Sequence, residues 1–271
     1  MKTNSLCFMI LLLLRISHHA RSEPIDSSNL PFLVSIWFNE KLHCGGIIYD
    51  SKHVITTTGC VQGIPPDLLI VLVKDMMFPY FNEMQYSVKS YVTHPSYRQI
   101  GMQGRSGSYT IDDIAVITLV NPFLLRHRLR PASFKQSGEG LTSLLNRRPY
   151  KYVGWTRPTY LTPQPLVLHV SNVTLDRHGK KEDTHYTAVL PDIYSCGRLR
   201  LTRCLENRGT PILAQTDSSN SEVIAILTDL SFIPSDAILG TFLKVRKYMT
   251  WIQQTIERNP SSSSFESIEL E

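Results

Sequence analysis

The sequence has 271 residues, enough for one large all-β domain or two small ones. It contains 28 lysines and arginines, of which Lys2, Arg15 and Arg21 lie in the first 22 residues. The remaining 25 face 23 acidic residues, a net charge of +2. This near balance excludes a strongly basic nucleic-acid-binding surface, and no nucleic-acid partner is expected.

The chain opens with a short apolar run, LCFMILLLL at 6–14, which follows Lys2 and precedes small residues at 20–22. A charged start, a short apolar core and a small-residue exit are typical of a secretory signal peptide. We therefore predict that residues 1–22 form a signal peptide cleaved after Ser22. A short N-terminal anchor is the alternative, although the run is too short to span a bilayer. With no longer apolar run downstream, we expect a secreted, extracellular protein without a membrane span.

Short β-rich runs fill most of residues 23–258, which we expect to form the folded domain. The predicted strands cover 31–38, 44–49, 53–58, 68–73, 85–94, 114–120, 150–155, 166–175, 187–191, 210–216 and 222–230. Many short strands without helical patterns between them indicate an all-β barrel or sandwich.

The end of the chain has a different pattern. Residues 244–258 place five apolar side chains on one face at helical spacing: Val245, Tyr248, Met249, Ile252 and Ile256. They predict an amphipathic helix that packs on the body and stops at Asn259-Pro260. Residues 259–271 contain a serine run and three glutamates, so we expect a disordered tail. A binding or sorting role for the tail is the alternative.

Four cysteines remain beyond the leader: Cys44, Cys60, Cys196 and Cys204. They allow three pairings, and an oxidising compartment favours disulfides over free thiols. Asn172-Val173-Thr174 is an acceptor sequon, which predicts a glycoprotein modified at Asn172.

Six segments resemble stretches of one enzyme family, in the same order and with compatible gaps. They are HCGGIIYDSKHVITTTGC (43–60), YVTHPSY (91–97), IDDIAVITL (111–119), YVGW (152–155), CLENRGTP (204–211) and VRKYMTWIQQTI (245–256). The family is that of the trypsin-like (chymotrypsin-fold, S1) serine proteases, and the similarity covers about residues 31–258. The resemblance implies two six-stranded antiparallel β-barrels packed face to face, with the C-terminal helix laid across them.

In that family a serine attacks the substrate, a histidine takes the serine's proton, and an aspartate orients the histidine. The resemblance places the aspartate at Asp113, the histidine position at Gly59 and the serine position at Arg208. Glycine has no side chain to accept a proton, and a guanidinium is permanently protonated. No functional catalytic residue is therefore expected.

Neighbouring positions also differ from the family in ways that imply a loss of catalysis. Glu206 replaces a glycine of the oxyanion loop, where its carboxylate would oppose developing negative charge. Asn207 replaces the aspartate that pairs with a new N-terminal amine after activation cleavage. The family's activation sequence is also missing, since the chain reads RSEPIDSSNLPF at 21–32. The resemblance therefore implies a catalytically inactive homologue.

No other side chain is an evident substitute for the missing histidine or serine. His53 lies six residues before Gly59, roughly 20 Å away along an extended strand. We expect it and the other downstream histidines to be exposed or structural: His43, His94, His127, His169, His178 and His185. Thr210 is the hydroxyl nearest to Arg208, but it has no identifiable base. No cluster has metal-ligand spacing, so neither a metal nor a cofactor is expected.

The resemblance also covers the substrate pocket. Thr202 stands where trypsins carry an aspartate, and Thr228-Asp229-Leu230 replace a pocket wall. These changes predict a reshaped or blocked cleft, although Asp229 facing water is the simpler alternative.

The family's disulfides are only partly matched. Cys44 and Cys60 match a loop-closing pair in the family. Cys196 and Cys204 lack their usual partners, so they either pair with each other or remain free thiols.

Two groups of arginines suggest a charged binding surface. One group is Arg198, Arg200, Arg203 and Arg208, and the other is Arg126, Arg128 and Arg130. They are candidates for an anionic glycan or an acidic protein surface, and solvated loop charges are the alternative.

The leading hypothesis is a secreted, inactive trypsin-like homologue that acts by binding a protease, an inhibitor or a receptor. Loops on a rigid scaffold supply such recognition surfaces. Reproduction, cascade regulation and defence are the processes considered. The rivals are a weak or unconventional hydrolase and a structural component of a secreted matrix or granule.

Overall fold

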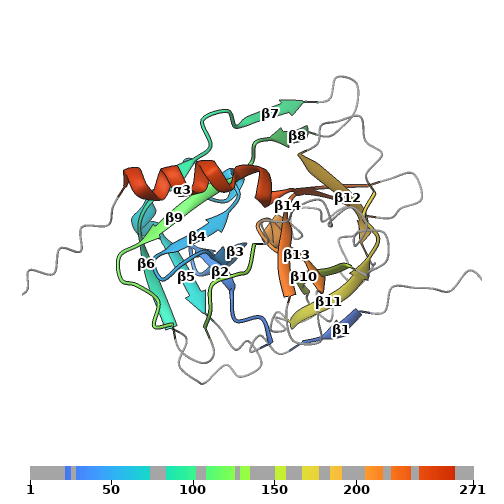
Figure 1. The fold of residues 1–271 in the computed structure, drawn as a ribbon, viewed down its shortest axis with the longest axis horizontal. Coiled ribbons are helices and arrows are strands. Elements are labelled where there is room, and N and C mark those ends of the chain that lie inside the picture. The colour runs from blue at the N-terminus through green and yellow to red at the C-terminus, as the bar shows by residue number, and fades with distance from the viewer. Residues whose placement is uncertain are drawn as a thin grey trace, which may run out of the picture.

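The structure is a computed structural model. It describes residues 22–25, 29–73, 84–101, 108–125, 129–134, 150–156, 167–176, 184–190, 205–215, 221–232 and 238–259. Two curved β-structures lie side by side, and the C-terminal helix α3 (Met249–Arg258) runs along the first of them (Figure 1).

The first structure is a closed barrel of six antiparallel strands. Around the barrel the order is β2 (Leu33–Phe38), β3 (Lys41–Ile48), β4 (His53–Thr56), β9 (Ala115–Leu119), β6 (Met84–Thr93) and β5 (Leu69–Val73). Asn39 and Glu40 both have positive φ in the β2–β3 hairpin, the geometry that matches the twist of paired strands. Fully buried side chains such as Ile36, Ile47 and Ile117 fill the interior.

The second structure is a seven-stranded sheet that curls toward closure. Its order is β1 (Ser22–Pro24), β11 (Val167–Val173), β10 (Tyr150–Thr156), β13 (Pro211–Gln215), β14 (Ser221–Phe232), β15 (Ile238–Leu243) and β12 (His185–Leu190). A single bridge between Asp176 and Thr187 links the end of β11 to β12. Tyr152 and Phe242 pack edge to face in its core, with ring centroids 5.6 Å apart. The predicted all-β, trypsin-like double-barrel class is confirmed, with the second barrel as a curled half-barrel.

Four strands were not predicted: β1, β7 (Arg98–Gly101), β8 (Ser108–Ile111) and β15. Strands β7 and β8 pair with each other as a separate ribbon beside α3 (Figure 1). The predicted strand at 53–58 was wrong at its end, because β4 stops at Thr56 and Thr58–Cys60 form a 3₁₀ turn, η2. Pro66–Leu68 form a second such turn, η3.

The C-terminal prediction is confirmed in outline. A 3₁₀ turn, η7 (Val245–Tyr248), leads into α3, which ends before Asn259 as expected. The Tyr248 hydroxyl donates to Asp112 Oδ1 at 2.5 Å, and the His94 ring packs edge-on against both Tyr248 and Trp251. These contacts fasten the helix to the first barrel.

Within the described residues, no helix has the length and apolar character needed to cross a membrane. Of the expected signal peptide (1–22) and tail (259–271), only Ser22, at the start of β1, and Asn259, at the end of α3, are described; the other residues lie outside the described part, so both remain predictions.

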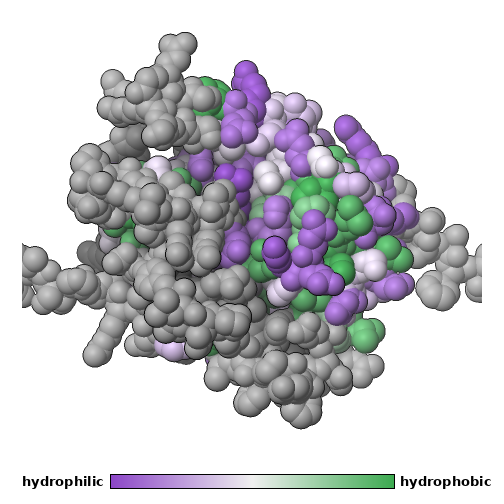
Figure 2. All heavy atoms as spheres, turned by 180° about the vertical axis from the view of Figure 1, so that it is seen from behind, coloured by the Kyte–Doolittle hydropathy of each residue, from purple (hydrophilic) through white to green (hydrophobic). Residues whose placement is uncertain are grey.

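Exposed apolar side chains gather on the first barrel. The large hydrophobic residues exposed there are Leu68, Ile70, Met84, Val120, Leu124 and Leu125. Figure 2, which views the molecule from behind, shows apolar side chains surrounded by hydrophilic ones on this side. The first barrel therefore presents an apolar patch on its outer face.

Candidate functional site

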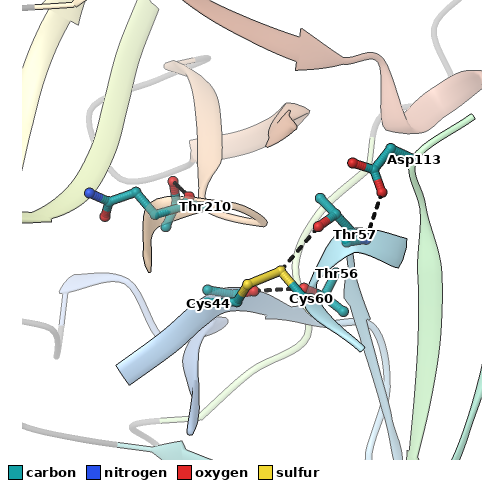
Figure 3. Close-up of a disulfide and its surroundings, with 9 residues drawn as sticks. Cys44, Thr56, Thr57, Cys60, Asp113 and Thr210 are labelled. Atoms are coloured by element: carbon teal, nitrogen blue, oxygen red, sulfur yellow. Dashed lines mark hydrogen bonds between the residues drawn. A yellow bond between two sulfur atoms is a disulfide. The ribbon is translucent and has the colours of Figure 1, made fainter. Parts of the chain in front are cut away.

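The turn that carries Gly59 is rigidly held. The Cys60 N–H donates to Thr57 O at 3.1 Å, and the Thr58 hydroxyl donates to Ile114 O at 2.9 Å. A disulfide joins Cys60 to Cys44 on β3, which confirms this predicted pair (Figure 3). The position that the resemblance assigns to a histidine is thus fixed against both β3 and the segment before β9.

Asp113 lies over this turn and is completely buried (Figure 3). Its Oδ1 accepts a hydrogen bond from the Gly59 N–H at 3.0 Å. Its Oδ2 is also buried and has no hydrogen-bond partner among the described residues. Burial raises the pKa of Asp113, although the Gly59 N–H and the charge of Arg208 act in the opposite direction. The carboxylate is therefore positioned by the backbone but only partly compensated.

Arg208 approaches Gly59 from the second β-structure. It follows the 3₁₀ turn η6 (Leu205–Asn207), and its carbonyl accepts a hydrogen bond from the Gly45 N–H at 2.7 Å. A Cβ atom added at Gly59 would lie 3.3 Å from Arg208 Nη1 and 3.8 Å from Asp113 Oδ2. The guanidinium thus lies where a larger side chain at position 59 would project.

Asp229 on β14 is the second carboxylate beside Arg208. The Arg208 Nη2 atom lies 3.8 Å from Asp229 Oδ1, and the two side chains are 22% and 13% exposed. Burial raises the pKa of Asp229, and the Arg208 charge opposes this shift. The simple alternative that Asp229 faces water is therefore wrong, because this side chain is largely buried against Arg208.

Sequence reasoning missed two neighbours of this cluster. Burial and the negative charge of Asp113 raise the pKa of Tyr97, which places the phenol near the cluster. Burial lowers the pKa of His43, and the charge of Arg208 lowers it further. The sequence shows His43 only as the residue before Cys44 in a strand, which predicts an exposed or structural role. Gly45 on β3 contacts Arg208, Gly209 and Thr210, and the spacing of these residues in the sequence does not reveal that contact.

The side-chain amide of Asn207 holds the loop that contains Arg208 by two hydrogen bonds to the backbone of Trp155. Asn207 is buried, its Oδ1 accepts from the Trp155 N–H at 2.7 Å, and its Nδ2 donates to Trp155 O at 3.0 Å. Glu206, the position expected to disturb an oxyanion loop, lies half-buried on the same turn. Asn207 therefore forms two hydrogen bonds with the β10 backbone, and neither bond requires a charged partner.

Thr210 is not poised as a nucleophile. It is completely buried, and its hydroxyl donates to Asn207 O at 2.7 Å (Figure 3). His53 is likewise remote from the site, at the opposite end of β4 from Gly59. Its Nδ1 lies 2.8 Å from both oxygens of Asp50. Burial acts to raise the pKa of Asp50, but the hydrogen bonds from His53 and Lys52 outweigh it and leave this pKa lowered.

The remaining predicted positions are spread over the molecule. The Asn172 side chain is exposed on β11, as a glycan acceptor must be. Arg130 is exposed, whereas Arg208 is half-buried between the two β-structures and so is not a solvated loop charge. The positions that lie outside the described residues are Cys196, Cys204, Thr202, Arg126, Arg128, Arg198, Arg200, Arg203, His127 and His178. Among the described residues, no group of three or more His, Cys, Asp or Glu is placed to hold a metal ion.

The barrel, the curled half-barrel and the C-terminal helix define a domain of the trypsin-like double-barrel class. The family model described as Trypsin matches residues 20–252, and the chain belongs to this family.

Three curated relatives have low sequence identity to this chain. The chain is 20% identical over 253 residues to phenoloxidase-activating enzyme 1 of Spodoptera litura, covering 85% of this chain and 65% of that protein. It is 19% identical over 248 residues to the proclotting enzyme of Tachypleus tridentatus, with coverage of 86% and 64%. For melanization protease 1 of Drosophila melanogaster the identity is 21% over 241 residues, with coverage of 79% and 58%. The chain thus spans slightly less than two thirds of the length of these relatives.

The raised pKa of Asp113 predicts how stability depends on pH. A carboxyl whose pKa is higher in the folded than in the unfolded protein stabilises the fold fully below the unfolded value. That contribution is lost as the pH rises through the folded value. Lowering the pH from 7 toward the unfolded value, about 4, should therefore stabilise the native protein relative to the Asp113→Asn variant, whose amide does not titrate.

Urea unfolding of both proteins at pH 7, 6 and 5 measures the difference. Asp67→Asn, at an exposed carboxyl on η3, serves as the matched control and should track the native protein. A constant difference in the free energy of unfolding between native protein and Asp113→Asn would contradict the prediction.

Proposed function

We propose that this chain is a secreted trypsin-family domain without peptidase activity that acts by binding another protein. The observation that carries the proposal is the position of Arg208. Its guanidinium lies 3.3 Å from where a side chain on Gly59 would begin. Arg208 occupies the position expected for the nucleophilic serine, and Gly59 occupies the position expected for the histidine base. A permanent cation therefore lies where the base should be.

The chemistry of acyl transfer needs both missing groups. A peptide carbonyl must be attacked by an oxygen that loses its proton to a base in the same step. Arg208 has no such oxygen, Gly59 has no base, and the nearby Thr210 hydroxyl already donates to Asn207. In a serine protease of known kinetics, removing the triad reduces kcat by roughly 10⁶-fold. Glu206 adds a carboxylate near the expected oxyanion position, so the residual rate should be lower still.

The binding role rests on what the fold retains. A rigid double-barrel scaffold presents loops that can recognise a partner without doing chemistry. The names of the relatives refer to phenoloxidase activation, clotting and melanization. By analogy with these names we favour a regulatory role in an extracellular cascade, with a protease, an inhibitor or a receptor as the partner. The apolar leader and the exposed Asn172 sequon support passage through the secretory pathway.

A fluorophosphonate probe, which labels activated serine and threonine hydroxyls, tests the loss of activity. We expect no labelling of the purified protein under conditions that label an active trypsin completely. Arg208→Ser should also remain unlabelled, because Gly59 still provides no base.

Thr210→Val is the control that separates the rival hypothesis. Heat-sensitive labelling of the native protein that disappears in Thr210→Val would identify an unconventional hydrolase and overturn the proposal. Labelling that survives in both Arg208→Ser and Thr210→Val would place an active hydroxyl elsewhere and overturn it equally.

A further inference from the structure

A single cation lies between carboxylates contributed by the two halves of the molecule. Asp113 immediately precedes β9 of the closed barrel, and Asp229 lies on β14 of the curled sheet. Arg208 reaches toward both from the loop between η6 and β13. We propose that Arg208, Asp113 and Asp229 form an ionic latch between the two β-structures, which opens when its carboxylates are protonated.

The latch can open through a side-chain movement alone. The Arg208 carbonyl is held by the Gly45 N–H at 2.7 Å, and the next residue, Gly209, donates its N–H to Leu227 O at 2.8 Å. The backbone on both sides of the guanidinium is therefore fixed to the two β-structures. Because this backbone is fixed, protonation of Asp113 or Asp229 can change only the orientation of the Arg208 side chain.

The ion pairing within the latch is incomplete. Arg208 Nε and Asp113 Oδ2 are both buried, and neither has a hydrogen-bond partner among the described residues. The Arg208 Nη2 atom lies 3.8 Å from Asp229 Oδ1, which is long for an ion pair. A buried cation remains in place only while its countercharges compensate the loss of hydration. Arg208 therefore depends on the ionised state of both carboxylates more than a fully hydrogen-bonded arginine would.

Lowering the pH makes the surroundings of Arg208 more positive at each titrating group. Burial raises the pKa of both Asp113 and Asp229, so they lose their charge at a higher pH than exposed carboxyls do. Tyr97 stays neutral throughout, since its pKa is raised. His43 becomes positively charged only in acid, because burial and Arg208 lower its pKa, and it then repels the guanidinium. Glu206, on the turn before Arg208, is the remaining acidic side chain of that loop.

The consequence is a surface that depends on pH. With both carboxylates ionised, the guanidinium lies beside Gly59, near Asp113 and Asp229. In mild acid it turns toward solvent and changes the charge that the loop after η6 presents. The inference deepens the proposed function by giving the binding site a regulator, although the latch itself does not require the domain to be inactive.

Arginine-selective labelling with phenylglyoxal, read by peptide mass spectrometry, tests the latch. The double variant Asp113→Asn/Asp229→Asn mimics the protonated carboxyls at the alkaline pH that the reagent needs. We expect Arg208 to react about tenfold faster in this variant than in the native protein, since its buried charge has lost both countercharges. Asp229→Asn alone should give an intermediate rate, and Asp67→Asn should match the native protein.

Exposed Arg130 provides the internal reference in every digest. Equal Arg208 rates in native and double-variant protein would overturn the latch. So would a native Arg208 rate as fast as that of Arg130. Near-UV circular dichroism identifies a misfolded double variant, in which case Asp229→Asn decides with the same criteria. The readout is independent of serine-probe labelling, so the latch and the loss of activity can fail separately.

Discussion

Replacing Gly209 by alanine is expected to prevent stable folding. Gly209 has a φ of +80°, and a Cβ added there would lie 2.2 Å from Gly45 O and 2.7 Å from Thr56 Oγ1. The same Gly45 carbonyl accepts the Thr56 hydroxyl at 2.8 Å, so the obstacle is hydrogen-bonded backbone with no free space to retreat. We expect a loss of more than about 4 kcal/mol, the range reserved for severe core disruption.

Gly63 offers a matched control. Its φ of +79° is almost the same, but an added Cβ would meet nothing within 4 Å. Gly63→Ala should therefore cost only the left-handed backbone penalty, about 1–2 kcal/mol. Soluble yield and chemical denaturation of the two variants measure the difference. Similar free energies of unfolding would show that the close contact between Gly209 and Gly45 does not constrain the fold.

Removing the Cys44–Cys60 disulfide should produce the second large effect. The bridge closes a loop with a sequence separation of 16, for which the chain-entropy model gives about 3 kcal/mol. Both cysteines are buried, and Thr57 Oγ1 donates to Cys60 Sγ at 3.0 Å. The variant Cys44→Ala/Cys60→Ala should unfold at a correspondingly lower denaturant concentration.

Reduction of the native protein provides the control for the disulfide. It should reproduce at least most of the loss without replacing either cysteine, and any Cys196–Cys204 bridge would be reduced with it. An unchanged midpoint in both the variant and the reduced protein would mean that the flanking hydrogen bonds of the turn hold this segment by themselves.

The all-β class could be predicted because many short β-rich runs and one helical pattern dominate the sequence, and the double barrel followed from the resemblance to the trypsin-like family. The missed strands have weak local signals. Strand β1 has only three residues, and β7 and β8 have only four each, too few to stand out as a pattern. Strand β15 contains Gly240, where an added Cβ would collide with the Phe242 ring, so its pattern is broken by packing. Tertiary contacts, which a single sequence does not display, stabilise these strands.

The sequence could predict which residues lie together at the site, but not how their side chains are oriented. Motif order placed Gly59, Asp113 and Arg208 together, and the geometry brings them within a few ångströms. Spacing could not reveal where a long side chain points. The pairing of Arg208 with Asp229 and the proximity of His43 therefore emerged only from the structure.

The amide pair between Asn207 and Trp155 has a consequence for how such a domain is controlled. A loop held by two neutral hydrogen bonds does not wait for a new terminal amine, so cutting the chain upstream should leave its shape unchanged. We expect the domain to have no dormant precursor form. The amount of protein made and the place of its delivery would then control it, because a cut upstream would not alter this loop.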